Sequence, residues 1–266
     1  MEPHNLVATR RLHHLVFRSK MWRILATGFA FSVFGLIGLV YSLTLFPLLV
    51  IAPVSTEKRR IWARSLIGVT FRLYLKMLNF LGLISYEVSN KEALYDSGQL
   101  IIANHPSLLD VVFLMAMVPA NCVVKSSLWR NPFTAMAVRA ADYIPNDDPA
   151  IYERCLSVLG CGESLIIFPE GTRSTPGQPL KFHRGPAHIA MGAKPLIRPV
   201  LIECEPATLI KNQAWYQVPD SPPHFAFRVM PLLKTDLELG DDLPSSVARR
   251  INKHWQTYFY ENLRRN

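Results

Sequence analysis

The sequence has no Asp, Glu, Lys or Arg between positions 25 and 54. A bilayer core is crossed by roughly 20 apolar residues, and the apolar core of a signal peptide is only about 7–15 residues long. The stretch therefore predicts a membrane anchor, either one tilted span or a re-entrant hairpin, and Pro47 and Pro53 favour a break near its end. The alternative is a buried helix of the globular domain that follows.

Metal-binding motifs are missing as well. The four cysteines, at positions 122, 155, 161 and 204, show no Cys-x-x-Cys spacing and no pairing with a His-x-x-x-His run. This pattern disfavours a zinc site, and we expect no metal ligands. The cysteines are interpreted as reduced thiols in the core of a cytosolic domain.

Charged residues are scarce at 18% of the chain, yet the net charge is +9. Such a balance indicates an anionic partner: lipid headgroups, a phosphorylated substrate, an acidic carrier or nucleic acid. No helix-turn-helix, zinc module or aromatic-rich basic module supports nucleic-acid binding, so we expect none.

Lys and Arg flank the uncharged stretch on both sides, at positions 10, 11, 18, 20 and 23 before it and 58, 59, 60 and 64 after it. By the positive-inside rule both flanks are cytoplasmic, which suits a re-entrant hairpin better than a single crossing. We expect residues 1–60 to form a basic N-terminus and membrane anchor, and residues 61–266 a catalytic domain facing the cytosol at the inner membrane.

The pattern after the anchor predicts an α/β fold: a mixed, largely buried sheet flanked by helices. An amphipathic helix is expected over 61–84, either at the headgroup level or packed on the domain. Apolar strands are expected at 100–103, 122–124, 164–168 and 196–202, with an edge strand at 224–230. Helices are expected over 108–117, 132–141 and 152–159, and a last helix has an apolar stripe at 247, 251, 255, 259 and 263.

Two polar segments follow predicted strands. In the first, Asn-His-Pro-Ser-Leu-Leu-Asp at 104–110, Pro106 is expected to begin a helix, which places His105 in the turn and Asp110 about one and a half turns inside the helix. A carboxylate that orients a histidine lets the ring remove a proton from an alcohol. Alone, such a pair is more often structural than catalytic.

The second segment is Phe-Pro-Glu-Gly-Thr-Arg-Ser at 168–174. Its glycine allows close backbone approach, Thr172 and Ser174 offer hydroxyls, and Arg173 supplies a planar fork of donors that suits phosphate. Lys181, His183 and Arg184 add positive charge before Gly185 and Pro186 begin a helix. The two segments together indicate an anion site beside a general base.

Asn-His-x4-Asp followed by Phe-Pro-Glu-Gly-Thr-Arg-Ser resembles the glycerol-3-phosphate and 1-acylglycerol-3-phosphate (lysophospholipid) acyltransferase superfamily, and 195–200 is similar to its later Pro-containing strand. The resemblance covers roughly residues 60–205. It implies that His105 is the general base and Asp110 its partner. It further implies that Glu170, Gly171, Thr172 and Arg173 belong to the acceptor-binding site. We add Asn104, Ser174, Lys181 and Arg184, from the same segments and the stretch that follows them, to the predicted substrate-binding set.

The resemblance also implies transfer of a fatty acyl group to the hydroxyl of a lysophosphatidate-like acceptor in phospholipid biosynthesis. Acyl-CoA or acyl-carrier protein is the co-substrate, with no bound cofactor. The expected partners are the lipid membrane, the lysolipid acceptor and, where it is the donor, acyl-carrier protein.

One departure from the family pattern concerns the acceptor. The family's second block usually ends in an arginine that holds the acceptor phosphate, whereas here Tyr-Ile-Pro-Asn stands at 143–146. Arg139, Arg154 and Arg184 are the candidate replacements. Without one, the acceptor becomes an amino-acid-containing lipid, another lysophospholipid or a specialised polyene or fatty-acid product. A hydrolase and a non-catalytic lipid-binding protein are the rival functions.

Overall fold

The computed structural model describes residues 19–235 and 243–264. Its α-helices are α2 Lys20–Leu43, α3 Leu45–Ile51, α4 Thr56–Phe80, α5 Asp110–Met117, α6 Ala135–Ala140, α7 Ile151–Gly160, α8 Gly185–Ala193 and α9 Pro244–Leu263. Two 3-10 helices, η1 Lys91–Tyr95 and η2 Ser126–Trp129, join them. The strands are β1 Ser85–Ser89, β2 Gln99–Ala103, β3 Asn121–Val124, β4 Ile144–Pro145, β5 Leu165–Ile167, β6 Leu196–Glu205 and β7 His224–Val229.

The strands form one sheet in the order β1-β7-β6-β2-β5-β3-β4. Five of them, from β6 to β4 in that order, are parallel, and β1 and β7 run the opposite way because β7 pairs antiparallel with β6. Strand β2 lies in the middle, and all five of its residues are buried. This arrangement confirms the predicted mixed sheet and brings the carboxyl ends of β2, β5 and β3 to one edge.

The predicted edge position of residues 224–230 is wrong. Strand β1 lies outside β7, pairing Tyr86 with Phe225 and Val88 with Phe227. Only alternate residues of β1 turn inward, and Tyr86 packs edge-on against Phe113 at 5.1 Å between ring centroids. Strand β1 contains only two apolar residues, which alternate with two serines and a glutamate. This alternation is too short to predict a strand from the sequence.

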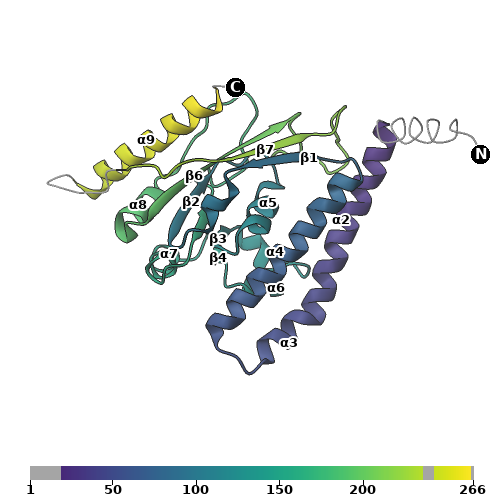
Figure 1. Ribbon diagram of the computed structural model, residues 1–266, viewed down its shortest axis with the longest axis horizontal. Helices are drawn as coiled ribbons and strands as arrows, with labels where there is room; N and C mark the ends of the chain where they lie inside the picture. The colour runs from purple at the N-terminus through teal and green to yellow at the C-terminus, as the bar shows by residue number, and fades with distance from the viewer. Residues whose placement is uncertain (1–18, 236–242, 265–266) are drawn as a thin grey trace, which may run out of the picture.

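Helices cover both faces of the sheet, which gives two apolar cores (Figure 1). Helices α4, α5 and α6 pack on one face, and α7, α8 and α9 on the other. The predicted stripe on α9 is confirmed, because Val247, Ile251, Trp255 and Phe259 are fully buried or nearly so. The predicted helix at 132–141 is shorter and begins at Ala135.

All four cysteines have free thiols. Cys122 and Cys155 are buried, as expected of core thiols, and Cys204 is half-buried. Cys161 is exposed, so its predicted place in the core is wrong. It follows the last residue of α7, where the chain turns toward β5, and a turn at the end of a helix lies at the surface.

Helices α2, α3 and α4 form an antiparallel hairpin on one side of the molecule (Figure 1). Phe34 of α2 stacks on Phe71 of α4, and Tyr74 of α4 donates a hydrogen bond to the carbonyl of Ala30. The continuous apolar part, Lys20–Ile51, is 32 residues long, which is enough to cross a membrane. Since α4 runs through residue 60, the division of the chain at that residue stays a prediction.

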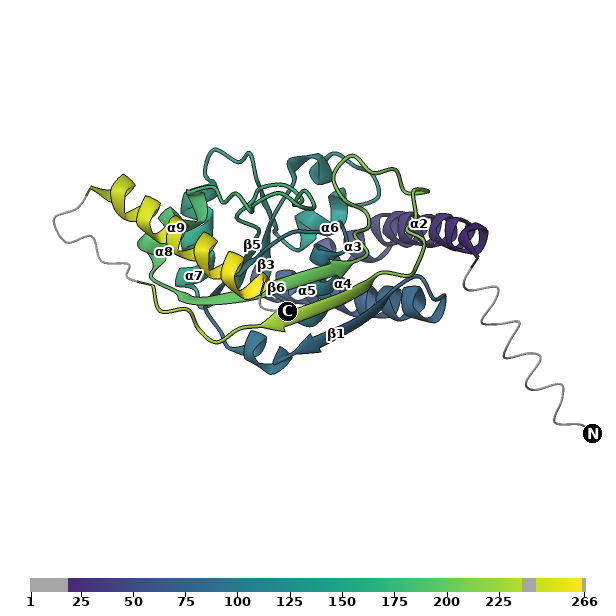
Figure 2. The same ribbon diagram turned by 90° about the horizontal axis from the view of Figure 1, so that it is seen from above.

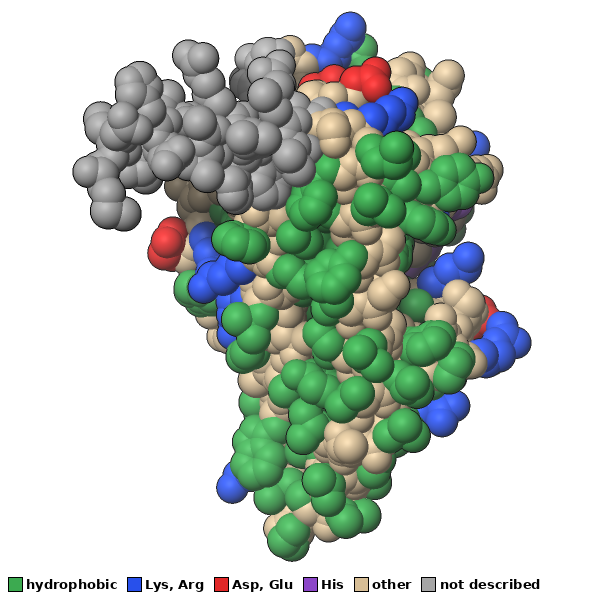
Figure 3. All heavy atoms as spheres, turned by 90° about the vertical axis from the view of Figure 1, so that its right-hand side faces the viewer, with side chains coloured by type: hydrophobic (Ala, Val, Ile, Leu, Met, Phe, Trp, Pro, Cys, Tyr) green, Lys and Arg blue, Asp and Glu red, His purple; other side chains and the backbone are tan. Residues whose placement is uncertain are grey.

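The outer surface of the hairpin is apolar (Figure 3). Large exposed apolar side chains follow one another along α2, α3 and α4, at positions 21, 25, 29, 36, 40, 43, 45, 48, 50 and 51 and then at 61, 62, 69, 73 and 80. The inner surface of α2 contacts the domain through glycines. A Cβ on Gly28 would lie 3.1 Å from the ring of Trp215, and one on Gly38 would lie 2.3 Å from the carbonyl oxygen of Phe133.

Gly38→Ala should therefore destabilise the fold by about 1–3 kcal/mol, because a methyl group there overlaps backbone that has no room to move. Gly35→Ala is the matched control: its Cβ would lie 3.9 Å from the Phe133 ring, an ordinary contact, and helix propensity favours alanine by up to about 1 kcal/mol. Thermal unfolding of both variants in the same detergent measures the difference. Equal melting temperatures would show that α2 does not pack this closely.

Candidate active site

The candidate site lies where two neighbouring parallel strands end. Strand β2 ends at Ala103 and continues into Asn104 and His105, while β5 ends at Ile167 and continues into the 168–174 segment. The two strands pair residue by residue from Leu100 with Leu165 to Ile102 with Ile167. Their polar continuations are therefore level with each other at the carboxyl edge of the sheet, where ligands bind in α/β folds.

His105 and Asp110 form a hydrogen-bonded pair, with 2.9 Å between Nδ1 of the ring and Oδ2 of the carboxylate. The same oxygen accepts the backbone N–H of Ser107 at 2.7 Å. A carboxylate accepts only, so Nδ1 carries the proton and Nε2 of the neutral ring is left as the acceptor. The carboxylate is fully buried and the imidazole is 14% exposed, so only the histidine side of the pair can be reached from outside.

The place of Asp110 in its helix differs from the prediction. Helix α5 begins at Asp110, not at Pro106, and residues 106–109 form a turn. The Asp110 carboxylate folds back onto the Ser107 N–H and closes this turn. The carboxylate therefore orders the turn that precedes α5 while it also holds the imidazole.

Burial raises the pKa of Asp110. The hydrogen bond from His105, the charge of that ring, the Ser107 N–H and the charge of Arg173 each lower the pKa and so oppose burial. Among the described residues, Oδ1 of Asp110 has no hydrogen-bond partner. The carboxylate is consequently a destabilised group that the fold holds in place.

Glu170 joins the two polar segments. One of its carboxylate oxygens accepts the backbone N–H of His105 at 2.9 Å and the hydroxyl of Ser174 at 2.9 Å. The Ser174 N–H in turn donates to the carbonyl of His105 at 2.7 Å. Burial raises the pKa of Glu170, and these two donors oppose the rise. Glu170 and Ser174 thus fix the backbone of His105 from both sides.

The turn at Gly171 requires a glycine. Its φ is +64°, in the left-handed region, and a Cβ there would lie 3.2 Å from the ring of His183. The N–H of His183 donates to the carbonyl of Pro169 at 2.8 Å. The segment that follows residue 180 is therefore fastened to this turn, and Thr172 beside it is exposed.

Arg173 lies beside the His–Asp pair, but one of its nitrogens is already engaged. Nη1 donates to the carbonyls of Leu209 at 2.7 Å and Ile210 at 3.0 Å. Leu209 has a φ of +49°, a strained value for leucine, and its carbonyl also accepts the N–H of Leu108 at 3.2 Å. Nothing in the sequence marks residues 208–210, so their contact with the site was missed.

Three other residues of the predicted substrate-binding set make no hydrogen bond or ion pair with the side chains of His105, Asp110 or Arg173 in the part of the chain that the structure describes. Asn104 is buried and exchanges two hydrogen bonds with the backbone of Ile202, at 2.7 and 2.8 Å, so it fastens the end of β2 to β6. Lys181 and Arg184 lie on the exposed surface of the segment that leads away from Gly171. Phe168, which sequence reasoning passed over, stacks on the His105 ring at 4.3 Å between centroids.

Arg139 and Arg154, two of the candidate replacements for the missing arginine, are engaged in other contacts. Arg154 pairs with Asp148 at 2.7 Å and with Asp142 at 2.8 Å, so carboxylates already neutralise its charge. Arg139 donates to the carbonyl of Trp129. Asn146, which occupies the position itself, accepts the N–H of Ser126 and so orders the chain after β3.

Lys125 is a cation that sequence reasoning missed. It is exposed and directly follows β3. Strand β3 pairs with β5 so that Cys122 is level with Ile166. Because β3, β5 and β2 are parallel, Lys125 at the carboxyl end of β3 lies at the same edge of the sheet as His105.

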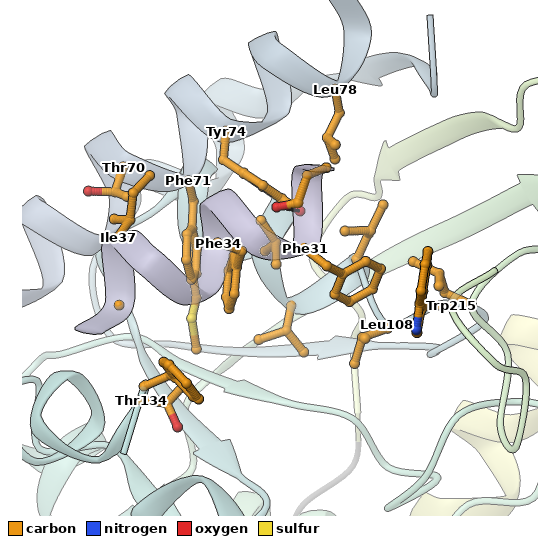
Figure 4. A pocket seen from close by; sticks show the side chains of 18 of the residues that line it. Phe31, Phe34, Ile37, Thr70, Phe71, Tyr74, Leu78, Leu108, Thr134 and Trp215 are labelled. Atoms are coloured by element: carbon orange, nitrogen blue, oxygen red, sulfur yellow. Dashed lines mark hydrogen bonds between the residues drawn. The ribbon is translucent and has the colours of Figure 1, made fainter. Parts of the chain in front are cut away.

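An apolar cavity of about 400 Å³ adjoins the site, between the helical hairpin and the sheet domain. Leu108 and Leu109, which follow His105 in the chain, line it together with α2, α4, α5 and the 208–219 segment. Figure 4 shows Leu108 and Trp215 at one end, aromatic rings of α2 and α4 along the middle, and Ile37 and Thr134 at the other end. The cavity begins beside the turn at 106–109 and extends under the hairpin.

No metal site accompanies this arrangement within residues 19–235 and 243–264: no three His, Cys, Asp or Glu side chains there are grouped to hold an ion. What the described residues offer is an oriented imidazole, nearby cations and an apolar cavity. Together they suit proton abstraction from a hydroxyl that lies next to a bound hydrocarbon chain.

Asp110→Asn should raise the stability of the protein at neutral pH by about 1–2 kcal/mol, because an amide costs less to bury than a carboxylate. The wild-type carboxyl has a raised pKa in the folded state, so its destabilising effect is present above that pKa and disappears as the pH falls toward the ordinary value. The gain from the substitution should therefore shrink on acidification. Denaturant melts of both proteins from pH 7.5 to 4.5 test this, and a gain that is constant with pH would contradict it.

The family model described as Acyltransferase matches residues 85–203. A 1-acyl-sn-glycerol-3-phosphate acyltransferase of Cocos nucifera is 34% identical over 144 residues, which are 50% of this chain and 45% of that protein. The enzyme of the same name from Helicobacter pylori is 33% identical over 118 residues, 41% of this chain and 50% of that protein. The chain thus spans about half the length of these curated relatives.

The fold has a solved counterpart. The crystal structure of the 1-acyl-sn-glycerophosphate acyltransferase PlsC from Thermotoga maritima superposes with a TM-score of 0.68. The match covers 93% of this chain and 99% of that one, at 19% sequence identity. At this identity the comparison concerns the fold alone, and it extends over the helical hairpin as well as the sheet.

Proposed function

Because the chain belongs to the lysophospholipid acyltransferase superfamily, we propose that it transfers a fatty acyl group from a thioester donor to the hydroxyl of a lysophosphatidate-like acceptor. The observation that carries the proposal is the His105–Asp110 pair, in which a buried carboxylate holds Nδ1 and directs Nε2 outward as a base. Both relatives are 1-acyl-sn-glycerol-3-phosphate acyltransferases, which agrees with this proposal.

In the proposed reaction, Nε2 of His105 removes the proton of the acceptor hydroxyl as its oxygen attacks the thioester carbonyl. The C–S bond then breaks, the acyl group remains on the acceptor oxygen as an ester, and the thiolate takes the proton back from the imidazolium. Asp110 stabilises the imidazolium between these two steps. The enzyme forms no acyl intermediate of its own, and no metal or bound cofactor takes part.

The apolar cavity is the proposed site for the acyl chain. It begins at Leu108, three residues after the base, and its wall consists almost wholly of hydrocarbon and aromatic side chains. A volume of about 400 Å³ lies in the range of small-molecule ligand pockets. A thioester placed at His105 could therefore keep its hydrocarbon tail out of water throughout the reaction.

The acceptor phosphate is proposed to lie near Arg173 and Lys125. Arg173 uses Nη1 for loop carbonyls, which leaves its other guanidinium donors for a phosphate. Lys125 follows the carboxyl end of β3, at the same edge of the sheet. Glu170 and Ser174 support this site through the backbone of His105, and Gly171 and Thr172 form its open turn.

The lack of free positive charge at Asn146 and Arg154 favours a second class of acceptor, one without the phosphate of lysophosphatidate as its only polar group. Asn146 brings no charge where the family has an arginine, and Arg154 is neutralised by two aspartates. With less positive charge than its relatives, the site would tolerate an amino-acid-containing lipid, another lysophospholipid or a specialised polyene or fatty-acid product. Lipid analysis of cells that express the active protein would name the acceptor.

The hairpin is the proposed membrane contact. One side of α2 is fixed to the domain at Gly28 and Gly38, so lipid cannot surround the helix, while its other side exposes a row of large apolar residues. Cations stand at both ends of the row, Lys20 at one and Lys58 at the other. This pattern supports a hairpin that lies along the inner membrane, with its charged ends among the headgroups and the catalytic domain in the cytosol.

His105→Ala should lower the rate of acyl transfer by roughly 10²–10⁴, the usual contribution of a general base, without unfolding the protein. A coupled thiol-release assay with and without a lysophosphatidate acceptor measures it. Normal turnover in this variant would remove the proposed mechanism. Thiol release without acceptor would indicate a hydrolase, and no release by the wild-type protein with any donor would indicate a non-catalytic lipid-binding protein.

Ala137→Phe should shift the donor preference toward shorter acyl chains, because Ala137 of α6 lines the cavity and a phenyl ring there fills part of it. Ala135→Phe serves as the control, because Ala135 lies on the same helix but does not line the cavity. Competition between donors of 10 and about 18 carbons measures the preference. If both variants kept the wild-type preference, the acyl chain would have to bind elsewhere.

A further inference from the structure

A basic strip leads from the candidate site to the last helix. It begins at Gly171, whose turn is fastened to the N–H of His183 through Pro169. Lys181 and Arg184 are exposed on either side of Phe182 and His183. The segment is then bound to α9: Asn252 donates to the carbonyl of Phe182 at 3.0 Å, and Gln256 accepts the Phe182 N–H at 3.3 Å.

Helix α9 continues the strip. Its inner face holds the buried stripe, and Arg249, Lys253 and Arg264 are exposed on the outer face. At 100° per residue these three cations project from neighbouring directions, on the flank next to Asn252 and Gln256. Arg264 lies over the ring of Tyr260, 4.8 Å from its centroid. The helix therefore carries exposed positive charge in its first half, at Arg249 and Lys253, and again at its C-terminal end, at Arg264.

We name this surface the α9 ridge: Lys181, Arg184, Arg249, Lys253 and Arg264. Between positions 244 and 264 the sequence holds one acidic residue, Glu261, against four Lys or Arg. Arg249 and Arg264 are separated by roughly 22 Å along the helix axis. That length is greater than the phosphates of a single nucleotide can follow, so the ridge suits an acidic surface of macromolecular size.

The ridge is far from the apolar hairpin. In Figure 2 α9 lies beside α8 at one end of the molecule, and α2 lies at the other. A membrane that covers the exposed apolar residues of α2 would lie on the side of the molecule away from α9 (Figure 1). The placement therefore favours a soluble acidic partner over anionic lipid.

We propose that the α9 ridge docks an acidic acyl-carrier protein and directs its acyl thioester to His105. The inference rests on the function proposed above, because it identifies how the donor arrives. A flexible arm that starts at the ridge would pass Arg184 and His183 to reach the turn at Gly171 and the base behind it. Charge attraction at such a rim mainly raises the rate of association, so its loss is measured as a higher KM for the carrier-bound donor.

The test compares acyl-carrier protein and acyl-CoA that carry the same acyl chain, with one lysophosphatidate acceptor. In the double variant Arg249→Glu, Lys253→Glu we expect the KM for the carrier-bound donor to rise about tenfold and the kcat to stay within about twofold. The acyl-CoA parameters should stay unchanged. Added salt should raise the wild-type KM for the carrier-bound donor toward that of the variant, because screening removes the same attraction.

Lys91→Glu is the control for a change in net charge, because Lys91 belongs to η1, next to β1 at the far edge of the sheet. Melting temperatures of all variants show whether the fold is intact. An equal loss with both donors, or a wild-type enzyme that accepts acyl-CoA alone, would overturn the proposal. So would an unchanged KM together with weaker binding to anionic vesicles, which would assign the ridge to the membrane. Inactivity of the wild-type protein with both donors would instead refute the proposed function.

Discussion

The hydrogen bond between the fully buried carboxylate of Asp110 and Nδ1 of His105 is the interaction on which the rest of the site depends. It sets the tautomer of the ring, and it requires the turn at 106–109 that brings the two side chains together. Burial of that carboxylate costs free energy. The Ser107 N–H, the charge of Arg173 and the imidazole itself offset part of this cost. The neighbouring segment at 168–174 then holds the backbone of the same histidine through Glu170 and Ser174.

The cavity gives the helical hairpin a proposed role in substrate binding besides its proposed contact with the membrane. Its wall is shared between the sheet domain and α2 and α4, so neither part encloses it alone. Gly28 and Gly38 allow α2 to approach Trp215 and the Phe133 backbone closely enough to close that wall. A hairpin that contacts the membrane with one side and bounds the cavity with the other would connect the lipid phase directly to the base.

Arg173 changes the interpretation of the second motif. The guanidinium proposed to bind phosphate also donates to the carbonyl of the strained Leu209, and this segment lines the cavity. The same residue thereby connects the region proposed for the acceptor with the region proposed for the acyl chain. A substitution of Arg173 would therefore affect the region proposed for the acceptor and the region proposed for the acyl chain at the same time.

The sequence by itself determined the class of fold and the two polar segments. Both rest on local patterns: continuous apolar strands need cover on two faces, and Asn-His-x4-Asp and Phe-Pro-Glu-Gly-Thr-Arg-Ser follow such strands. It also indicated that 25–54 is too apolar to face water. These properties depend on residue type and spacing along the chain, which are visible in one dimension.

Only the tertiary structure decided which distant groups meet. The start of α5 at Asp110, the outer position of β1, and the contact of Arg173 with the carbonyls of Leu209 and Ile210 involve backbone groups that every residue possesses, so no residue type marks them. The ion pairs of Arg154 with aspartates, and the contact of α9 with the 181–184 segment, likewise depend on register and on which side of a helix faces the core. The types of side chain determine the kind of site, whereas the packing of segments remote in the sequence determines which residues form it.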